Sequence, residues 1–196
     1  MKRFIARIAN AIDNALQNRQ LRSVNGHIGK AIRFNGKAIL NIHPKATLEI
    51  GDHVVFNSDN FNYHVNMFSA CKIMADRPGA VIRIGEKTRI HASCIHAFER
   101  IEIGKNVLIA ANCQIIDGNG HDASFENVDD RINTTGSSKP VIIEDSVWLA
   151  TGVVVLPGVR IGRGSIISAN SVVNSDIPSM CVAAGNPATV IKQIQG

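Results

Sequence analysis

The fold of this chain is decided by residues 141–173, which read VIIEDS VWLATG VVVLPG VRIGRG SIISAN SVV when written in groups of six. The third position of every group is a bulky aliphatic residue: Ile143, Leu149, Val155, Ile161, Ile167 and Val173. Neither the helix period of 3.6 nor the strand period of 2 produces a spacing of six. A six-residue repeat is typical of a parallel β-helix, in which three short strands form one triangular coil and successive coils stack at roughly 4.8 Å. We therefore predict an all-β solenoid.

From the second group onward, the first position forms another row, made of small or β-branched residues: Val147, Val153, Val159, Ser165 and Ser171. The same period appears upstream in broken stretches, where Ile50, Ile84 and Ile103 are each followed by Gly. It is absent from residues 117–139, which are rich in Gly, Asn, Asp, Ser and Thr. That segment predicts a long loop leaving the coil, and long loops on rigid scaffolds often carry function. A shorter irregular segment is expected between residues 57 and 78.

The N-terminal residues predict a helix with a continuous apolar face: Phe4, Ile5, Ile8, Ile12, Ala15 and Leu16. Basic residues occupy much of its remaining surface: Lys2, Arg3, Arg7, Arg19 and Arg22. We favour a helix that caps the open end of the β-helix, because terminal coils expose apolar edges that need cover. The alternative is a basic amphipathic helix on an anionic membrane, through residues 1–22. The predicted organisation is a helix over 1–24, a β-helix domain over 25–175 with its loop at 117–139, and a tail over 176–196.

Composition narrows the class of protein. Apolar residues make up 45% of the 196 residues and aromatic residues only 5%, which fits a narrow core of Ile, Val and Leu. The formal charge is +5, but no lysine-rich cluster or alternation of aromatic and basic residues points to nucleic acid. The four cysteines contain no C-x-x-C pair, and we expect Cys94 and Cys113 to be reduced fillers of the small-residue row. No signal peptide or membrane-spanning run is predicted, so we expect a cytoplasmic protein, peripheral at the inner membrane face if the helix binds lipid.

Several motifs then occur in an ordered series. They are IGKNVLIAAN at 103–112, DGNGHD at 117–122, KPVIIEDSVWL at 139–149, PGVRIG at 157–162 and AAGNPA at 183–188. In these motifs the sequence resembles the hexapeptide-repeat acyltransferases, closest to the branch of maltose, galactoside and surface-polysaccharide O-acetyltransferases. The resemblance covers residues 80–194. It implies a left-handed β-helix, a homotrimer with active sites between subunits, acetyl-CoA as cosubstrate, and a small-molecule or glycan hydroxyl as acceptor.

The resemblance also implies roles for particular residues. His121 matches the general base, and a histidine titrates near the pH at which a hydroxyl proton must be removed. The backbone N–H of Thr151 matches a donor to the oxyanion of the tetrahedral intermediate. The matched cofactor positions are Trp148, Thr151, Ala169, Asn174 and Ser175, and no metal is implied. Ser175 and Thr189 stand where relatives carry Lys and Arg; Arg160, Arg163 and Lys192 are the candidate substitutes.

Three other functions remain open at the level of sequence. His91 and His96 could bind zinc with a third ligand, as in γ-class carbonic anhydrases, which share the β-helix. We favour packed structural roles for both histidines, with His96 inward or at a corner. An N-acetyltransferase acting on an amino sugar would keep the cofactor and change only the nucleophile, and a non-catalytic scaffold would keep only the fold. We predict an O-acetyltransferase that transfers acetyl directly, without a covalent enzyme intermediate.

Overall fold

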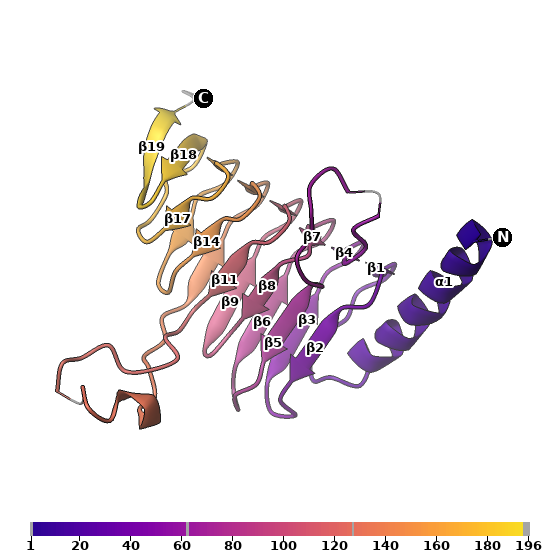
Figure 1. Cartoon of the computed structure of the whole chain (residues 1–196), viewed down its shortest axis with the longest axis horizontal. Coiled ribbons are helices and arrows are strands. Elements are labelled where there is room, and N and C mark those ends of the chain that lie inside the picture. The colour runs from indigo at the N-terminus through magenta and orange to yellow at the C-terminus, as the bar shows by residue number, and fades with distance from the viewer. Residues whose placement is uncertain (1, 62, 127, 194–196) are drawn as a thin grey trace.

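The computed structural model describes residues 2–61, 63–126 and 128–193, with side chains from Ala11 onward in these ranges. The chain is a left-handed parallel β-helix that has a helix at its N-terminal end and an antiparallel hairpin at its C-terminal end (Figure 1). The β-helix predicted from the six-residue period is confirmed.

Three sheets, parallel throughout except for the pairing of β18 with β19, form the sides of a triangular prism. Sheet 1 contains, in spatial order, β1 (Arg33–Asn35), β4 (Val55–Asn57), β7 (Arg89–His91), β10 (Leu108–Ile109), β13 (Trp148–Leu149), β16 (Ile166–Ile167), β18 (Cys181–Gly185) and β19 (Ala188–Gln193). Sheet 2 contains β2 (Ile39–Ile42), β5 (Lys72–Ala75), β8 (Cys94–His96), β11 (Gln114–Ile116), β14 (Val154–Val155) and β17 (Val172–Val173). Sheet 3 contains β3 (Thr47–Ile50), β6 (Val81–Ile84), β9 (Arg100–Ile103), β12 (Val141–Ile143) and β15 (Arg160–Ile161).

The strand register places one aliphatic row from each sheet inside the prism. On sheet 1, Ile90, Ile109, Leu149 and Ile167 lie directly opposite one another in successive strands. All six aliphatic residues of the repeat from Ile143 to Val173 are buried, and so are the five residues of the small row. The corners are tight: a Cβ on Gly104 would lie 2.6 Å from the backbone nitrogen of Asp145 in the next coil, so only glycine fits there.

One coil is a residue shorter than the period predicts. Ile90 and Ile95 are both inward although only five positions separate them, and Ser93 occupies the small-residue row between them. The Ser93 hydroxyl lies 2.8 Å from the Ala110 carbonyl and 2.9 Å from the Cys113 N–H, which joins two coils. Cys113 is buried as predicted, but Cys94 points outward, because the missing residue shifts it off the small row. The expectation that Cys94 fills the core was wrong.

Helix α1 (Lys2–Leu21) lies across the first coil beside β1, but it docks through a face that the sequence did not predict. The buried Gln17 side chain donates to the Ala38 carbonyl at 2.7 Å and accepts from the Ala38 N–H at 3.0 Å. Asn14 accepts from the Phe34 N–H at 2.8 Å, and Leu21 is fully buried. The first coil has no preceding coil to satisfy its backbone, so amide side chains are the effective partners for its free edge.

The described part of the apolar row of α1, which is Ile12, Ala15 and Leu16, is exposed. Ile12 is 55% exposed and Leu16 is 58% exposed. The helix therefore does cap the coil, through Asn14, Gln17 and Leu21 rather than through Ile12 and Leu16. The predicted members of that row at Phe4, Ile5 and Ile8, and the basic residues Lys2, Arg3 and Arg7, lie outside the described side chains. In the described residues, no helix has both the length and the apolar content needed to cross a membrane.

The C-terminal segment expected as a tail contains two strands. Strand β18 continues sheet 1 in parallel with β16, and β19 folds back to pair with β18 in the antiparallel direction. Figure 1 places this hairpin at the end of the prism opposite α1.

Candidate functional site

The long loop leaves the prism between β11 and β12 through a short two-stranded neck formed by residues 117–119 and 137–139. The Lys139 N–H donates to the Asp117 carbonyl at 2.7 Å, and the Asn119 N–H donates to the Ser137 carbonyl at 2.9 Å. The buried Asp117 carboxylate accepts three backbone N–H groups, from Phe98, Glu99 and Arg100, at 2.5–2.8 Å. The base of the loop is therefore fixed to the coil beneath it.

His121 comes two residues after the first strand of this neck, and its side chain is exposed. Its backbone is held close to the returning strand: a Cβ on Gly136 would lie 2.6 Å from the His121 carbonyl oxygen and closer still to the Asn119 carbonyl oxygen. Because real Cβ atoms do not approach so near, glycine at 136 determines how closely the two strands pack beside His121. Gly120, next to His121 in sequence, is in open space, where an added Cβ would meet no atom within 4 Å.

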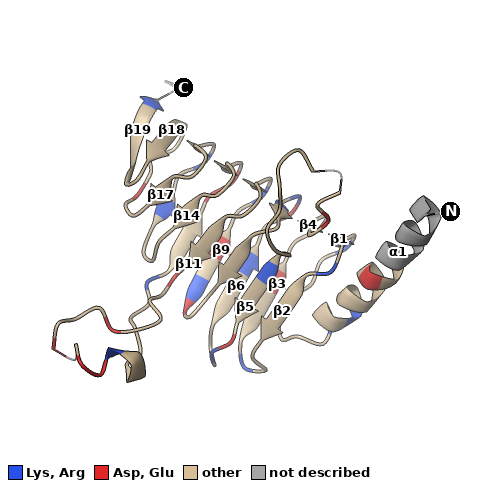
Figure 2. Ribbon diagram, in the orientation of Figure 1, with Lys and Arg blue, Asp and Glu red and all other residues tan. Residues whose placement is uncertain are grey.

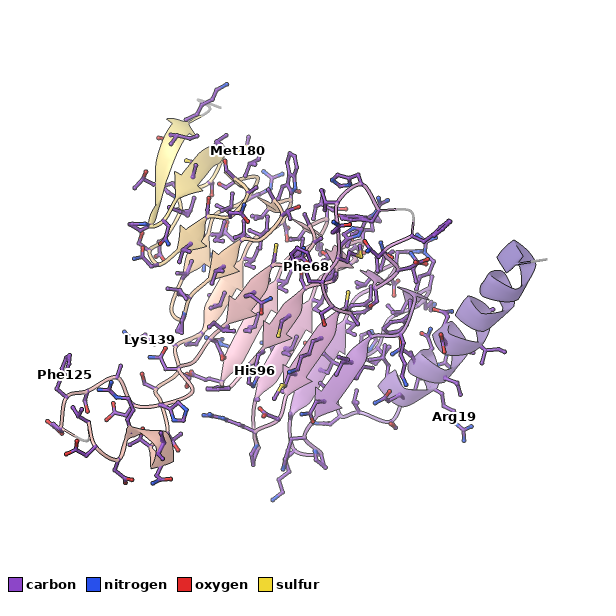
Figure 3. All side chains as sticks on the ribbon, viewed as in Figure 1. Arg19, Phe68, His96, Phe125, Lys139 and Met180 are labelled. Atoms are coloured by element: carbon purple, nitrogen blue, oxygen red, sulfur yellow. The ribbon has the colours of Figure 1, made fainter. Side chains whose placement is uncertain are left out.

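Asp122 does not orient the imidazole in this structure. Its carboxylate accepts from the Ser124 hydroxyl at 2.5 Å and from the Ser124 N–H at 2.9 Å. These hydrogen bonds, together with the charge of Arg131, hold the pKa of Asp122 below its usual value. Among the described residues no hydrogen bond joins Asp122 to the His121 ring. The loop beyond this point projects away from the prism, with Phe125 at its outer part and Lys139 at its base (Figure 3).

Three of the other predicted catalytic and cofactor residues, Trp148, Thr151 and Ala169, lie on sheet 1 and on the corner between sheets 1 and 2. Trp148 begins β13 and is 44% exposed, as its outward position predicts. It lies between Leu108 and Ile166 in the strand register, so an apolar strip runs along the outer face of sheet 1. Thr151 and Ala169 occupy equivalent turns in successive coils, and the Thr151 carbonyl accepts from the Asn170 N–H at 2.9 Å.

The Thr151 N–H donates to no backbone or side-chain group in the described part of the chain, which leaves it available to a ligand. The N–H of Ala169, at the equivalent position of the next coil, likewise donates to no group in the described residues. One coil earlier, the equivalent residue Ala111 is buried, and Tyr63 packs against the cluster that contains it. A free donor therefore recurs along this corner, and it does not by itself distinguish Thr151 from Ala169.

Asn174 and Ser175 follow β17 at the corner between sheets 2 and 3, the same corner from which the loop of His121 departs. The predicted site residues thus form two groups on different edges of the prism. His121, Asn174 and Ser175 lie on one edge, and Trp148, Thr151 and Ala169 lie on another face and corner. A single chain does not bring the two groups together.

The candidate phosphate-binding cations also differ in their surroundings. Arg160 forms an ion pair with Glu144 on the outer face of sheet 3. Arg163 is exposed at the next corner, and its backbone N–H is bonded to Glu144 at 2.7 Å. Lys192 lies on β19, opposite Val182, and so belongs to sheet 1 together with Trp148. Thr189 lies on the same strand.

His91 and His96 stand at different corners of one coil, so a single chain does not bring them to one ligand. His91 ends β7, where its Nδ1 lies 3.2 Å from the Asn57 amide and its ring stacks on Tyr63 at 4.7 Å. Burial, helped by the charges of Arg89 and His64, lowers the pKa of His91 to about 4. His96 ends β8 with its side chain outward, paired with Asp76 at 3.0 Å and edge-on to Phe98. Its predicted inward position was wrong, whereas the corner position fits.

A second irregular segment, residues 58–71, is shorter than the predicted span because β5 resumes the register at Lys72. The segment covers the corner between sheets 1 and 2, on the opposite side of the prism from the loop of His121 (Figure 1). The Asn112 side chain holds it, accepting from the Phe68 N–H at 3.0 Å and donating to the Asn66 carbonyl at 2.9 Å. The irregular sequence indicated the segment, but nothing in the sequence indicated that Tyr63 would stack on His91.

A shallow groove of about 470 Å³ runs along the outer face of sheet 3. It is lined by ion-paired residues, including Arg83, whose guanidinium bonds Glu49 at 2.8 Å and Glu102 at 2.9 Å. None of the predicted site residues lines this groove. The charges in it satisfy one another, which makes it a weak candidate for a substrate site.

Comparisons with known proteins agree with this architecture. Residues 140–175 match the family model described as bacterial transferase hexapeptide (six repeats). WbbJ of Escherichia coli (strain K12), provisionally named a lipopolysaccharide biosynthesis O-acetyl transferase, is 34% identical over 145 residues, covering 70% of this chain and 74% of WbbJ. The fold and these matches define a β-helical transferase. The chain belongs to the hexapeptide-repeat acetyltransferase family, and its relatives include sugar O-acetyltransferases.

Two other matches show how far the similarity extends. A Saccharomyces cerevisiae (strain ATCC 204508 / S288c) protein, provisionally named an acetyltransferase, is 45% identical over 95 residues, which are 48% of this chain and 46% of that protein. The chain therefore aligns with less than half of that relative's length. A hexapeptide-repeat acetyltransferase from Vibrio cholerae O1 biovar eltor, solved with acetyl coenzyme A, covers 97% of this chain and 86% of its own at a TM-score of 0.61 and 24% identity. At that identity the likeness shows the fold alone.

Proposed function

We propose that this protein is an acetyl-CoA-dependent O-acetyltransferase that modifies a hydroxyl of a sugar or glycan precursor, and that it acts as a homotrimer with its sites between subunits. The observation that carries the proposal is the division of the site residues between two edges of one chain. His121 is exposed on a loop that projects from the prism, while Trp148 and the free Thr151 N–H lie elsewhere on the surface. In a ring of identical subunits each edge of one chain meets a different edge of its neighbour, so two incomplete halves form one site.

The chemistry follows from the groups that would meet there. His121 removes the proton from the acceptor hydroxyl as its oxygen attacks the thioester carbonyl of acetyl-CoA. The Thr151 N–H donates to the oxyanion of the tetrahedral intermediate. A donor that is already fixed in position stabilises this developing charge and so lowers the activation barrier. When the intermediate collapses, the C–S bond breaks and the coenzyme A thiolate takes the proton from His121. The products are the acetyl ester and free coenzyme A.

The surface of sheet 1 suits the cosubstrate. The apolar strip of Leu108, Trp148 and Ile166 offers contact for a pantetheine arm, and Ala169 leaves the backbone of its turn accessible. Lys192 on the same sheet and the exposed Arg163 are the candidate partners for the phosphates, and Asn174 and Ser175 are candidate hydrogen-bonding partners from the other edge.

The cysteines support direct transfer rather than an acyl-enzyme. All four are free thiols, which also fits the reducing environment of the cytoplasm, where we propose that the protein acts. Burial raises the pKa of Cys113 to about 11, and it raises the pKa values of Cys71 and Cys94 as well. A protonated thiol is a poor nucleophile at neutral pH, so none of these three side chains suits a covalent step.

The test replaces His121 by Ala and measures release of the coenzyme A thiol with a panel of sugar and amino-sugar acceptors. We expect kcat to fall at least about a hundredfold, the usual contribution of a general base. His27→Ala is the matched control, because His27 is also exposed but lies before the first coil. Unchanged turnover in His121→Ala would sink the proposed mechanism. Turnover with amino sugars only would replace the hydroxyl acceptor by an amine.

A further inference from the structure

The N-terminal end of the prism combines two features that the acetyl transfer does not use. The first is the outward face of α1, where Ala11, Ile12, Ala15 and Leu16 are all exposed. The helix needs none of them for its own docking, which uses Asn14, Gln17 and Leu21 on the opposite side. A helix held by its polar side and presenting its apolar side to water is the reverse of ordinary surface amphipathicity.

The second feature is charge. Residues 1–48 contain nine Lys and Arg and a single acidic residue, Asp13, a formal charge of +8. Residues 49–196 contain twelve Lys and Arg against fifteen Asp and Glu, a formal charge of −3. The basic character of the whole chain therefore comes from its first quarter, and the remainder is slightly acidic.

The basic side chains at this end are available for contact. Arg19, Arg22, Lys30, Arg33 and Lys37 are exposed, and none takes part in an ion pair among the described side chains. Figure 3 shows Arg19 extending from α1 away from the prism. By contrast, the arginines farther along the prism, such as Arg83 and Arg160, are paired with glutamates, and acidic residues are spread along the strands and the loop of His121 (Figure 2).

From these features we infer that the outer face of α1, with the surrounding basic residues of the first coil, docks the protein on a bilayer that contains anionic lipid. An interfacial helix inserts an apolar face of limited area and needs cations around it to reach the headgroups. Each cation near an anionic surface contributes on the order of 1 kcal/mol, so several together with Ile12 and Leu16 give reversible binding. The prism would then stand with its N-terminal end on the membrane and the site of His121 away from it.

A second copy of the chain is the weaker occupant for this surface. Two copies that met through the same patch would bring two strongly basic ends together, because a two-fold contact pairs identical surfaces. Like charges at close range oppose such a contact. An anionic lipid surface offers the opposite charge and the apolar layer at once.

The experiment is co-sedimentation of the full chain with vesicles of phosphatidylcholine, with or without phosphatidylglycerol. We expect binding to the anionic vesicles only, weakened at about 0.5 M salt, where exposed charges are screened. Ile12→Gln/Leu16→Gln is expected to weaken it about tenfold or more, since two apolar side chains no longer leave water. Arg19→Gln/Arg22→Gln is expected to weaken it and to reduce its dependence on salt.

Val190→Gln/Ile191→Gln is the matched control, because it replaces two exposed apolar residues at the opposite end of the prism and is expected to bind as the wild type does. No binding by the wild type, equal binding to neutral vesicles, or normal binding by Ile12→Gln/Leu16→Gln overturns the inference. A changed oligomeric state in that variant, measured by light scattering without vesicle binding, assigns the face to a second copy instead. Release of the coenzyme A thiol with a soluble acceptor is measured in parallel for Ile12→Gln/Leu16→Gln and is expected to match that of the wild type. Failure of docking is therefore distinguishable from failure of the proposed function.

Discussion

Glycine at position 136 is expected to matter more for activity than glycine at position 120, although Gly120 is the direct neighbour of His121. A methyl group on Gly136 would lie 2.6 Å from the His121 carbonyl oxygen and closer to the Asn119 carbonyl oxygen. To reach an ordinary contact distance, the two strands of the neck must separate by about 1 Å. The hydrogen bond from the Asn119 N–H to the Ser137 carbonyl, now 2.9 Å, would lengthen with them.

A displacement of that size in a catalytic group costs on the order of a hundredfold in rate. We therefore expect Gly136→Ala to lower kcat/KM by at least about tenfold, since part of the strain relaxes in the exposed loop. In Gly120→Ala the new methyl meets no atom within 4 Å, so activity within about twofold of the wild type is expected. Neither change touches the core, and both variants should keep the thermal midpoint of the wild type.

The assay is release of the coenzyme A thiol under steady-state conditions, with circular dichroism melts as the measure of stability. Equal activity of Gly136→Ala and the wild type would refute the reasoning, because it would show that the neck does not position His121. A loss in Gly120→Ala as large as that in Gly136→Ala would also refute it, since the two variants differ only in whether a backbone clash exists.

Three further predictions concern other parts of the molecule. Gln17→Ala leaves the N–H and C=O of Ala38 without partners and should lower the free energy of unfolding by about 2–4 kcal/mol in urea titration; Gln20→Ala, on the exposed side, should not. Trp148→Ala removes half-exposed aromatic surface from sheet 1 and should raise KM for acetyl-CoA about tenfold with a smaller effect on kcat; an unchanged KM contradicts the cofactor position. Because the pKa of His91 is lowered from 6.5 to about 4, the folded state binds fewer protons than the unfolded state between these values. The free energy of unfolding is therefore independent of this group above pH 6.5 and falls as the pH decreases toward 4, by about 1–2 kcal/mol once solvent screening of a partly exposed ring is included. His91→Gln should flatten the dependence of stability on pH between these values. An unchanged slope in this variant would show that His91 is not the source of the dependence.

The β-helix was predictable because its core uses one side chain per sheet in each coil. That geometry forces a period of six on the sequence, and Ile143 to Val173 keep it without a slip. The shortened step from Ile90 to Ile95 was not predictable, because Cys94 and Ser93 are both small enough for the row that only Ser93 occupies. The number of residues between Ile90 and Ile95 decides which side chain lies in the small-residue row, and the type of side chain does not.

The docking of α1 shows a different limit of sequence patterns. Burial of apolar surface usually dominates helix docking, which favours the apolar row that contains Ile12 and Leu16. At the end of a β-helix the competing demand is the unpaired backbone of the first coil, and Gln17 and Asn14 meet it. Periodicity identified the helix but could not identify which face docks.

Of the candidate site, the sequence predicted residue types and the long loop but not their separation in space. His121 and Thr151 are thirty positions apart and lie on different edges of the prism, a relation that depends on which corner each turn occupies. To assign each turn to a corner, the strands must be counted along the chain from one coil to the next. The loop at 117–139 interrupts the period of six, so this assignment cannot be carried across it from the sequence.

The two closures of the prism have a consequence for assembly. A parallel β-helix with bare ends could add further coils from another molecule and grow into a filament along its own axis, as open sheet edges do. Here α1 packs beside β1 at the first coil, and β19 runs antiparallel to every other strand of sheet 1, so sheet 1 offers a second molecule no parallel edge to continue at the far end. Association along the axis through sheet 1 is thereby discouraged, whereas the sides of the prism are surfaces through which subunits can join.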